Sequence, residues 1–380
     1  MNDAEGGRVL KGITWDHARG YDPLVATSEQ FAEAHEGARI IWEKRSLQAF
    51  ADRPLEAMAA DYDLMVIDHP HVGSAARSGL LLPFDGAGAD DALSVLATQS
   101  CGVSHASYEY GGRQWALAID AAAPVSAYRP DLVDEIPATW TEVIVLSERG
   151  RVIWPLLPVN ALMSFYNLLA NIGEPFGADG NGVSPASGRA VLGEMLAVAR
   201  NLPAECFSMD PIGAYEWLSC RSSHGYVPYL YGYSNYSRAG FRPHLVRVAD
   251  VPALGREGPV GSTIGGTGIA ISSGSCQPEV AREYAFWIAS ADCQRDVYFR
   301  SGGQPANVVA WDDDACNRES HDFFRDTRKS LELAYLRPRH DGYMGFQDIG
   351  GSLVHACLTR REAVDKTVHA INEAYDRSLA

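Results

Sequence analysis

Apolar positions in the first part of the chain alternate between short runs and stripes with helical spacing. The run Val9–Thr14 predicts a strand, and the apolar positions that follow recur with the period of an amphipathic helix. Asp22 followed by Pro23 is typical of a helix start, with Asp22 as the cap, and Gly37 predicts where this helix stops.

The same alternation continues for two more rounds. Arg39–Trp42 and Asp63–Asp68 predict the second and third strands, and the third is apolar on both faces, as expected of a central parallel strand. Helices are predicted over Ser46–Tyr62, with an interruption near Pro54, and over His71–Ser78, which Gly79 ends. This order indicates a doubly wound α/β lobe.

The remainder of the chain predicts a second set of strands and helices. The segment Thr139-Trp-Thr-Glu predicts the start of a helix, with Thr139 or Thr141 as its cap, and Glu142 follows Thr139 at the spacing of a capping box. Other predicted elements are strands at Arg113–Ile119 and Ala123–Tyr128, helices at about 158–172, 185–200 and 210–220, strands with Gly-rich turns between 225 and 275, and mostly helix from Pro278 to Ala380.

Composition narrows the class of protein. The chain has 380 residues, enough for two domains or one large one, and a formal net charge of −16. This charge argues against binding to nucleic acid or to an anionic membrane surface. No apolar run approaches the roughly 18 residues needed to span a bilayer, so we expect no membrane insertion.

Two features bear on the cellular compartment. The first residues, MNDAEGGRVLKG, contain neither the basic nor the apolar region of a signal peptide. The seven cysteines are widely spaced and form no C-x-x-C pair, which fits a reducing compartment. The sequence as given therefore predicts a cytoplasmic protein, whereas removal of a signal peptide would make it periplasmic or extracellular.

Four segments occur in an order and spacing that carry a family resemblance. They are YDLMVIDHPHVGSAARSGLLLPFD (62–85), YEYGGRQWALAIDAAAPVSAYRPDLVDE (108–135), IPATWTEVIVLSERG (136–150) and IGGTGIAISSGSCQPEVAREYAFWIASADCQRDVYFRSGGQPA (264–306). Together they resemble the family 1 extracellular solute-binding proteins of ABC importers, which have the maltose-binding-protein-like, type II periplasmic-binding fold. Each segment alone is weak evidence, and none identifies a ligand.

The resemblance implies an α/β fold of two lobes, each a mixed sheet flanked by helices, with a ligand cleft between them. Lobe one would comprise 1–120 plus 268–315, and lobe two 121–267 plus 316–380, with hinge crossings near 120, 267 and 315. Members of this family trap a sugar or another small polar solute and deliver it to a permease.

Polar side chains follow the first and third predicted strands. In a doubly wound lobe the carboxyl ends of the strands face the ligand, which predicts contacts from Trp15, Asp16, His17, Arg19, Tyr21, Asp68, His69 and His71. Asp120, at the end of WALAID, is a further candidate where the family crosses between lobes. Alternatively, Asp16 and Asp68 cap helices, and Arg19 pairs with a nearby acid such as Asp22. His-Pro-His is not a standard zinc spacing, so we predict no metal and no cofactor.

Lobe two offers an unusual group of tyrosines. Tyr229, Tyr231 and Tyr233 alternate, so in a strand they would share one face and stack on a sugar or pack on a helix. Gly266 lies in a Gly-rich stretch that is not a phosphate loop and would allow the backbone to approach a ligand or cross between lobes. Tyr343, in DGYMGFQDIGG, can also reach the cleft.

These observations support two functions from different classes. The first is a solute-binding protein that clamps a small, polar, sugar-like ligand between its lobes and serves an ABC transporter. The alternative is a cytosolic enzyme that reuses this fold, with the histidine- and aspartate-rich loops as catalytic or metal-binding groups. Neither function involves nucleic acid.

Overall fold

The computed structural model describes residues 8–35, 37–46, 55–86, 88–178, 180–256 and 258–380. The chain forms two compact units. Unit 1 comprises Met1–Ala121 and Gly265–Cys316, and unit 2 comprises Ala122–Ile264 and Asn317–Ala380. The chain therefore passes from one unit to the other at 121–122, 264–265 and 316–317.

A sheet with both parallel and antiparallel strands forms the centre of unit 1. Its order is β2-β1-β3-β11-β4, and β7 also pairs with β11. The third predicted strand, β3, lies in the middle of the sheet, parallel to β1 and antiparallel to β11, in agreement with the mixed sheet expected for this lobe. The strands are β1 (Arg8–Trp15), β2 (Ala38–Arg45), β3 (Leu64–Ile67), β4 (Leu81–Leu82), β7 (Leu117–Ala122) and β11 (Gly265–Ser272).

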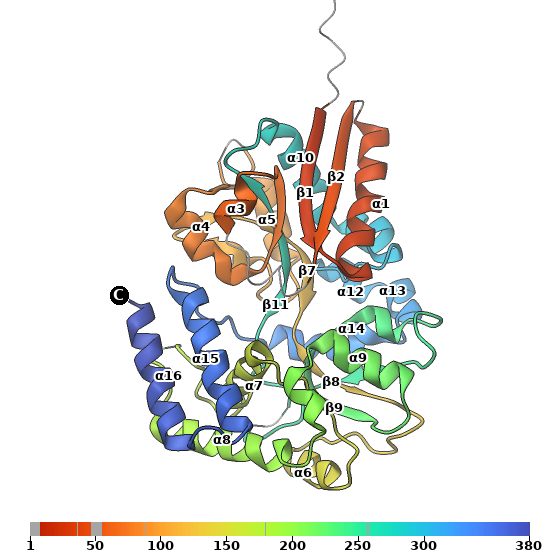
Figure 1. The fold of residues 1–380 in the computed structure, drawn as a ribbon. Coiled ribbons are helices and arrows are strands. Elements are labelled where there is room, and N and C mark those ends of the chain that lie inside the picture. The colour runs from red at the N-terminus through yellow and green to blue at the C-terminus, as the bar shows by residue number, and fades with distance from the viewer. Residues whose placement is uncertain (1–7, 36, 47–54, 87, 179, 257) are drawn as a thin grey trace, which may run out of the picture. The chain divides into compact units, whose positions relative to one another are not determined.

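Helices cover both faces of this sheet (Figure 1). Leu64 and Val66 of β3 belong to one core cluster, with residues of α1 and α10, whereas Met65 and Ile67 belong to another, with residues of α3 and α4. Alternate side chains of a strand point to opposite faces, so all four are buried. The other elements of unit 1 are α1 (Ala18–Ala34), α3 (Leu55–Ala59), η1 (His69–His71), α4 (Val72–Ser78), α5 (Asp90–Thr98), η2 (Ala106–Tyr108), β5 (Glu109–Tyr110), β6 (Arg113–Gln114), α10 (Pro278–Ala289), α11 (Ala291–Cys293), the π-helical turn η5 (Gln294–Tyr298), α12 (Val308–Asp312) and α13 (Asp314–Glu319), which continues into unit 2.

The first helix starts earlier than the sequence predicts. His17, and not Asp22, is its N-cap, because the Nδ1 atom of His17 accepts a hydrogen bond from the backbone N–H of Arg19 at 3.0 Å. Pro23 therefore lies inside α1. The predicted loop after the first strand is thus the end of β1 and the first turn of α1, which decides where Arg19 and Tyr21 lie.

Two further expectations need correction. The strand expected over Arg113–Ile119 is divided into the short β6 and the start of β7. In the helix expected over Ser46–Tyr62, only Leu55–Ala59 is α-helical among the described residues, and positions 47–54 lie outside them.

Unit 2 has a smaller sheet and more helix. Its three named strands have the order β10-β8-β9 and pair antiparallel, while an isolated parallel bridge joins Val152 to Tyr226. The expected helices at 158–172, 185–200 and 210–220 are confirmed as α7, α8 and α9. The elements are β8 (Pro124–Tyr128), α6 (Trp140–Glu148), α7 (Pro158–Asn171), α8 (Pro185–Ala199), η3 (Ala204–Ser208), α9 (Pro211–Cys220), β9 (Tyr226–Tyr231), η4 (Ser234–Ser237), β10 (Arg247–Ala249), α14 (Phe323–Glu332), α15 (Tyr343–Leu358) and α16 (Val364–Ser378).

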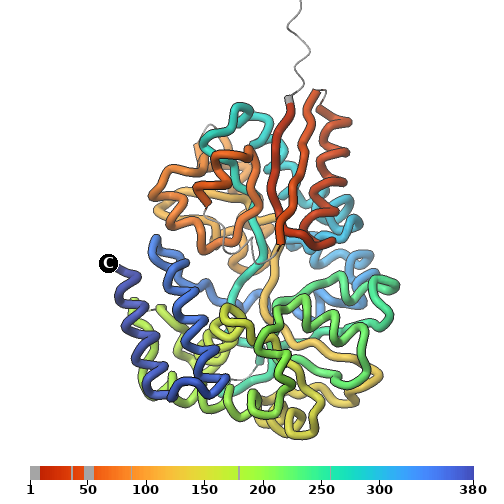
Figure 2. The backbone as a smooth tube through the Cα atoms, viewed as in Figure 1, coloured from red at the N-terminus to blue at the C-terminus, as the bar shows by residue number. Residues whose placement is uncertain are grey.

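Helix α7 is the buried helix of unit 2. Every residue from Ala161 to Asn171 is buried. Helix α15 packs against it so closely that a Cβ atom on Gly351 would lie 2.8 Å from the carbonyl oxygen of Pro158. Helices α15 and α16 lie side by side, as Figure 2 shows. The polar side chains of α7 are therefore held on a rigid element.

Local signals place several element ends correctly. Thr139 and Glu142 form the predicted capping box at the start of α6, and Gly79 ends α4 with a φ of 63°. Among the described residues, no helix combines the length and the apolar character needed to cross a membrane.

Candidate functional site

The carboxyl ends of two neighbouring strands define one candidate region of unit 1. Strands β1 and β3 are parallel, with Ile13 opposite Met65, so Trp15 and Ile67 end at the same edge of the sheet. Strand β11 is antiparallel to β3, with Gly268 opposite Ile67, so its beginning lies at this edge as well. The segments that follow β1 and β3 are thus brought together within unit 1.

A buried ion pair lies at this edge. Arg19, in the first turn of α1, donates from Nε to Oδ2 of Asp120 at 2.7 Å and from Nη2 to Oδ1 of the same carboxylate. Arg19 is 3% and Asp120 1% exposed. Burial raises the pKa of Asp120, and the guanidinium of Arg19 opposes this shift. The sequence predicted both residues as ligand contacts, but in the structure each binds the other.

The close approach of β11 to β7 explains why residue 266 is a glycine. Its φ is +98°, and a Cβ atom there would lie 2.1 Å from the carbonyl oxygen of Asp120. Only glycine fits such a close approach of β11 to β7. The sequence predicts that the backbone at Gly266 approaches a ligand or crosses between lobes. In the structure its close approach is to the backbone of β7.

Trp15 and His17 have structural roles beside this pair. Trp15 is 4% exposed, and its ring lies 2.3 Å from the position of a Cβ atom on Gly20. Because Nδ1 of the half-buried His17 accepts the capping hydrogen bond, a neutral His17 ring carries its proton on Nε2. His17 can thus cap α1 through one ring nitrogen while the other is a donor.

Asp16 and the ring of Tyr21 both contact Lys44, which was not among the predicted site residues. The Nζ atom of Lys44 lies 2.7 Å from Oδ1 of Asp16 and 5.0 Å from the ring centre of Tyr21. The hydrogen bond to Asp16 is the main cause of the raised pKa of Lys44. Asp16 is exposed and Tyr21 partly exposed, so this group differs from the Arg19–Asp120 pair in being open to water.

The three predicted site residues that follow β3 divide into buried and accessible side chains. His69 is fully buried, with Nδ1 3.1 Å from Oδ1 of Asp68 and its ring edge-on to Tyr108. Asp68 and His71 are partly exposed. Asp68 is the N-cap residue of η1 but makes no capping hydrogen bond with its side chain, so the predicted capping role is wrong here.

The tyrosines of unit 2 do not form one face. Tyr229 is buried, donates to the carbonyl oxygen of Pro252 at 3.0 Å and packs on Trp140. Tyr233 lies beyond the end of β9, buried against Tyr215, so the shared strand face predicted for it is wrong.

Tyr231 differs from the other two in being partly exposed. Its hydroxyl lies 3.0 Å from Oγ1 of Thr263. It also lines a small hollow between α7 and β9, together with Asn160 and Asn167. Tyr343, by contrast, is fully buried at the start of α15, with its ring near His340 and Phe346.

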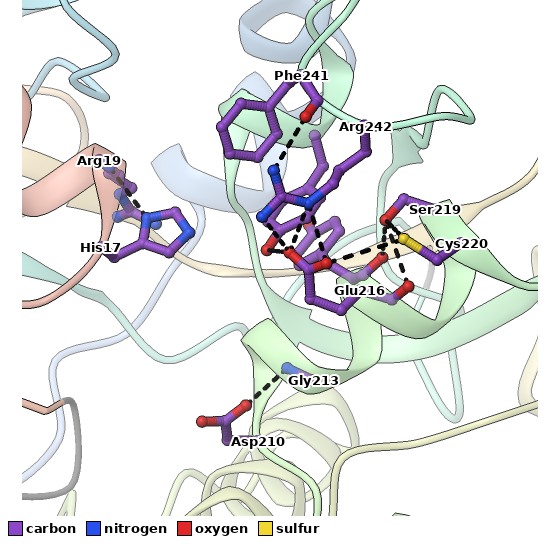
Figure 3. A network of polar contacts seen from close by, with 11 residues as sticks. His17, Arg19, Asp210, Gly213, Glu216, Ser219, Cys220, Phe241 and Arg242 are labelled. Carbon is purple, nitrogen blue, oxygen red and sulfur yellow. Dashed lines mark hydrogen bonds and ion pairs between the residues drawn. The ribbon is translucent and has the colours of Figure 1, made fainter.

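A further polar cluster surrounds Glu216 of α9, a residue that the sequence did not mark as a candidate (Figure 3). Arg242 donates from Nε to both carboxylate oxygens of Glu216, at 2.8 and 2.9 Å, and Tyr236 donates to Oε1 at 2.7 Å. The Arg242 guanidinium also stacks 4.5 Å from the ring centre of Phe241. These groups satisfy one another, so we assign the cluster a structural role.

Neither a metal site nor the large groove of unit 2 involves the predicted site residues within the described part of the chain. Among the described residues, no group of three or more His, Cys, Asp and Glu side chains is arranged to hold a metal ion. A groove of about 810 Å³ in unit 2 is lined by residues 132–137 and by side chains of α6. Glu142 in this groove is already bound to the backbone of Ala138 and Thr139, and the groove contains none of the predicted site residues.

The chain is similar to known proteins in its structure, whereas no sequence match was found. No protein-family profile and no curated protein sequence matches the chain. Solved structures of ABC solute-binding proteins match nearly all of it. The maltose-bound MalE3 protein of T. maritima has a TM-score of 0.82 at 18% identity, covering 97% of this chain and 99% of that one.

Two other structures show the same similarity with different ligands. The solute-binding protein of Thermotoga lettingae TMO bound to α-D-tagatose has a TM-score of 0.82 at 16% identity, covering 98% of this chain and 100% of that one. The protein of Agrobacterium radiobacter K84 in complex with ribitol has a TM-score of 0.78 at 19% identity, covering 98% of each chain. The expected fold, that of the two-lobed ABC solute-binding proteins, is thereby confirmed.

Proposed function

We propose that this protein is a solute-binding protein that holds a small, neutral sugar or polyol and delivers it to an ABC permease. The observation that carries this proposal is the full-length similarity to structures whose ligands are maltose, tagatose and ribitol. These three ligands are uncharged and carry several hydroxyl groups. Because one fold can host several functions, the side chains must support the proposal as well.

The accessible polar side chains suit such a ligand. In unit 1, Asp16, His17, Asp68 and His71 offer hydrogen-bond donors and acceptors and are exposed or partly exposed, as is the ring of Tyr21. We propose these five as ligand contacts.

Unit 2 would contribute Tyr231, whose ring can stack on the apolar face of a sugar while its hydroxyl makes a hydrogen bond. The remaining predicted residues would support these contacts from buried positions. They are Trp15, Arg19, His69, Asp120, Gly266, Tyr229, Tyr233 and Tyr343.

Binding can be tested with the ligands of the similar structures. Ribitol, D-tagatose and maltose are added separately in thermal unfolding and titration calorimetry, with gluconate as a charged control. A ligand at 100 times its Kd stabilises the folded state by about 2.7 kcal/mol, which gives a clear rise in Tm. If none of the three neutral compounds raises Tm at millimolar concentration, the proposed ligand class is wrong.

Two tyrosine variants provide a matched comparison. We expect Tyr231→Ala to weaken binding of the best probe, because its ring would contact the ligand. Tyr284→Phe removes only hydrogen bonds between its buried hydroxyl and residues of α1, such as Thr27 and Ser28, so it should lower stability and leave affinity unchanged. Equal affinities for Tyr231→Ala and the native protein would remove Tyr231 from the site.

Transport and catalysis make different predictions for the same bound probe. Closure of two lobes on a ligand reduces the radius of gyration measured by X-ray scattering at saturation, and a transport role requires the protein outside the cytoplasmic membrane, which cell fractionation measures. The enzyme alternative predicts instead that NMR spectra of the bound probe change with time. Turnover together with a cytoplasmic location would favour the enzyme.

A further inference from the structure

The hollow between α7 and β9 has the chemistry of a hydroxyl site. Its volume is about 10 Å³, which is near the lower limit for holding one water molecule or one hydroxyl group. All residues that line it belong to unit 2, and they include Asn160, Ser164 and Asn167 of α7 and Tyr231 of β9. None of its lining residues carries a charge.

Asn167 presents a hydrogen-bond donor to this hollow. Its Oδ1 atom accepts from the backbone N–H of Thr263 at 2.9 Å, which fixes the orientation of the amide. The Nδ2 atom, on a side chain that is 1% exposed, has no acceptor among the described residues. Buried amide donors are nearly always paired with protein, water or ligand, so this atom calls for an acceptor.

Asn160 presents an acceptor on the same side of α7. The two residues are seven positions apart, which is about two helical turns. The Oδ1 atom of Asn160 is buried and has no donor among the described residues. One side chain thus lacks an acceptor and the other lacks a donor, and both line the same hollow.

A hydroxyl group satisfies both requirements. It can accept from Nδ2 of Asn167 and donate to Oδ1 of Asn160, as a water molecule can. A carboxylate or phosphate only accepts, and an ammonium group only donates, so each would leave one amide unsatisfied. The absence of charged residues from the lining also disfavours an ionic ligand.

We propose that this hollow is a hydroxyl-recognition subsite, occupied by water in the unliganded protein and by one hydroxyl of a neutral sugar or polyol in the complex. The ligand part of this inference rests on the function proposed above. The subsite would select for a ligand with a hydroxyl at one position, because its deoxy analogue would leave a buried donor and a buried acceptor unpaired.

Asn171, one turn further along α7, provides a matched control. Its Oδ1 atom accepts from the backbone N–H groups of Leu254 and Gly255, and its Nδ2 atom donates to the carbonyl oxygen of Val260. It does not line the hollow. Asn171 therefore shares the residue type, the helix and the burial of Asn167, but its amide is fully used inside the protein.

The test compares Asn167→Asp with Asn171→Asp. Asn167→Asp can still accept from the N–H of Thr263 but loses the donor to the hollow. We expect it to weaken binding of whichever of ribitol, D-tagatose and maltose binds best by roughly 10- to 100-fold in calorimetry. Asn171→Asp should lower Tm without changing the affinity of the folded protein. An affinity for Asn167→Asp within a factor of about two of the native value would overturn the proposal.

Crystal structures keep the inference testable if a variant fails to fold. The native protein without ligand should show an ordered water within hydrogen-bond distance of Asn167 Nδ2 and Asn160 Oδ1, and the complex should show a ligand hydroxyl there. A dry hollow, or a complex whose hydroxyls all lie elsewhere, would overturn the subsite. If the native protein binds none of the three probes, the proposed function and the ligand part of the inference are both overturned for them, whereas an ordered water between the two amides would still support the hydroxyl chemistry of the hollow.

Discussion

The Arg19–Asp120 pair and the hollow with Asn160 and Asn167 satisfy their polar groups in opposite ways. In unit 1 two charged side chains are fully buried and bind each other. In unit 2 two neutral amides on one helix each keep a hydrogen-bonding atom without a partner among the described residues. The buried charged residues thus stabilise the fold, whereas each of the two asparagines has one hydrogen-bonding atom that a water molecule or a ligand can pair with.

The largest expected effect comes from breaking the ion pair. Asp120→Ala would leave the Arg19 guanidinium buried without its carboxylate, and removing one partner of a buried pair typically costs about 3–5 kcal/mol of unfolding free energy. Urea unfolding followed by circular dichroism measures this loss.

The double variant Arg19→Met with Asp120→Leu checks the cause. It should be more stable than Asp120→Ala, because neither buried position then carries a charge. If the two variants are equally unstable, the loss arises from packing and not from the unpaired charge.

The next largest effect is the loss of unfolding free energy expected when either of two asparagines of α7 is replaced by alanine. Asn171→Ala would leave two N–H groups and one carbonyl oxygen without their partner, and we expect a loss of about 3 kcal/mol. Asn167→Ala removes only the hydrogen bond to Thr263 and should cost about 1–2 kcal/mol. The reverse order of stability would show that Asn167, like Arg19, serves mainly the fold.

A smaller effect concerns pH and His105 of unit 1. Burial lowers the pKa of His105, so the unfolded chain binds a proton more readily than the folded one. Its contribution to stability is present above the unfolded pKa of about 6.5 and is lost as the pH falls through the lower folded value.

We therefore expect Tm to fall between pH 7 and pH 5, and to fall less in His105→Gln. The His224 and His340 side chains, whose pKa values are also lowered by burial, remain as a background in both proteins. An identical decrease in Tm for the native protein and His105→Gln would contradict the assignment to His105.

The smallest effect is expected at the exposed ion pair of unit 1. Asp16→Ala breaks the contact with Lys44, but exposed pairs contribute little to stability, so Tm should hardly change. Because Asp16 is proposed to contact ligand, calorimetry should show weaker binding. A marked loss of stability with native affinity would place Asp16 with Arg19 among the structural residues.

Much of the fold could be predicted from the sequence because its signals are local. Alternating apolar runs, the Thr139–Glu142 capping box and Gly79 depend on neighbours within a few residues, and the corresponding elements are present. The start of α1 could not be predicted in this way. Asp22-Pro23 is a good local signal, but the backbone turns at His17, whose side chain caps α1.

The sequence by itself determined the α/β order of elements and which segments follow strands β1 and β3. Only the tertiary structure decided which polar groups are satisfied. Asp120 is 101 positions from Arg19, and Thr263 is 96 positions from Asn167. A hydrogen-bond partner at such a distance is set by how strands and helices pack, and no local pattern encodes it. The same packing buries Arg19 with its partner and leaves the amides of Asn160 and Asn167 facing a hollow.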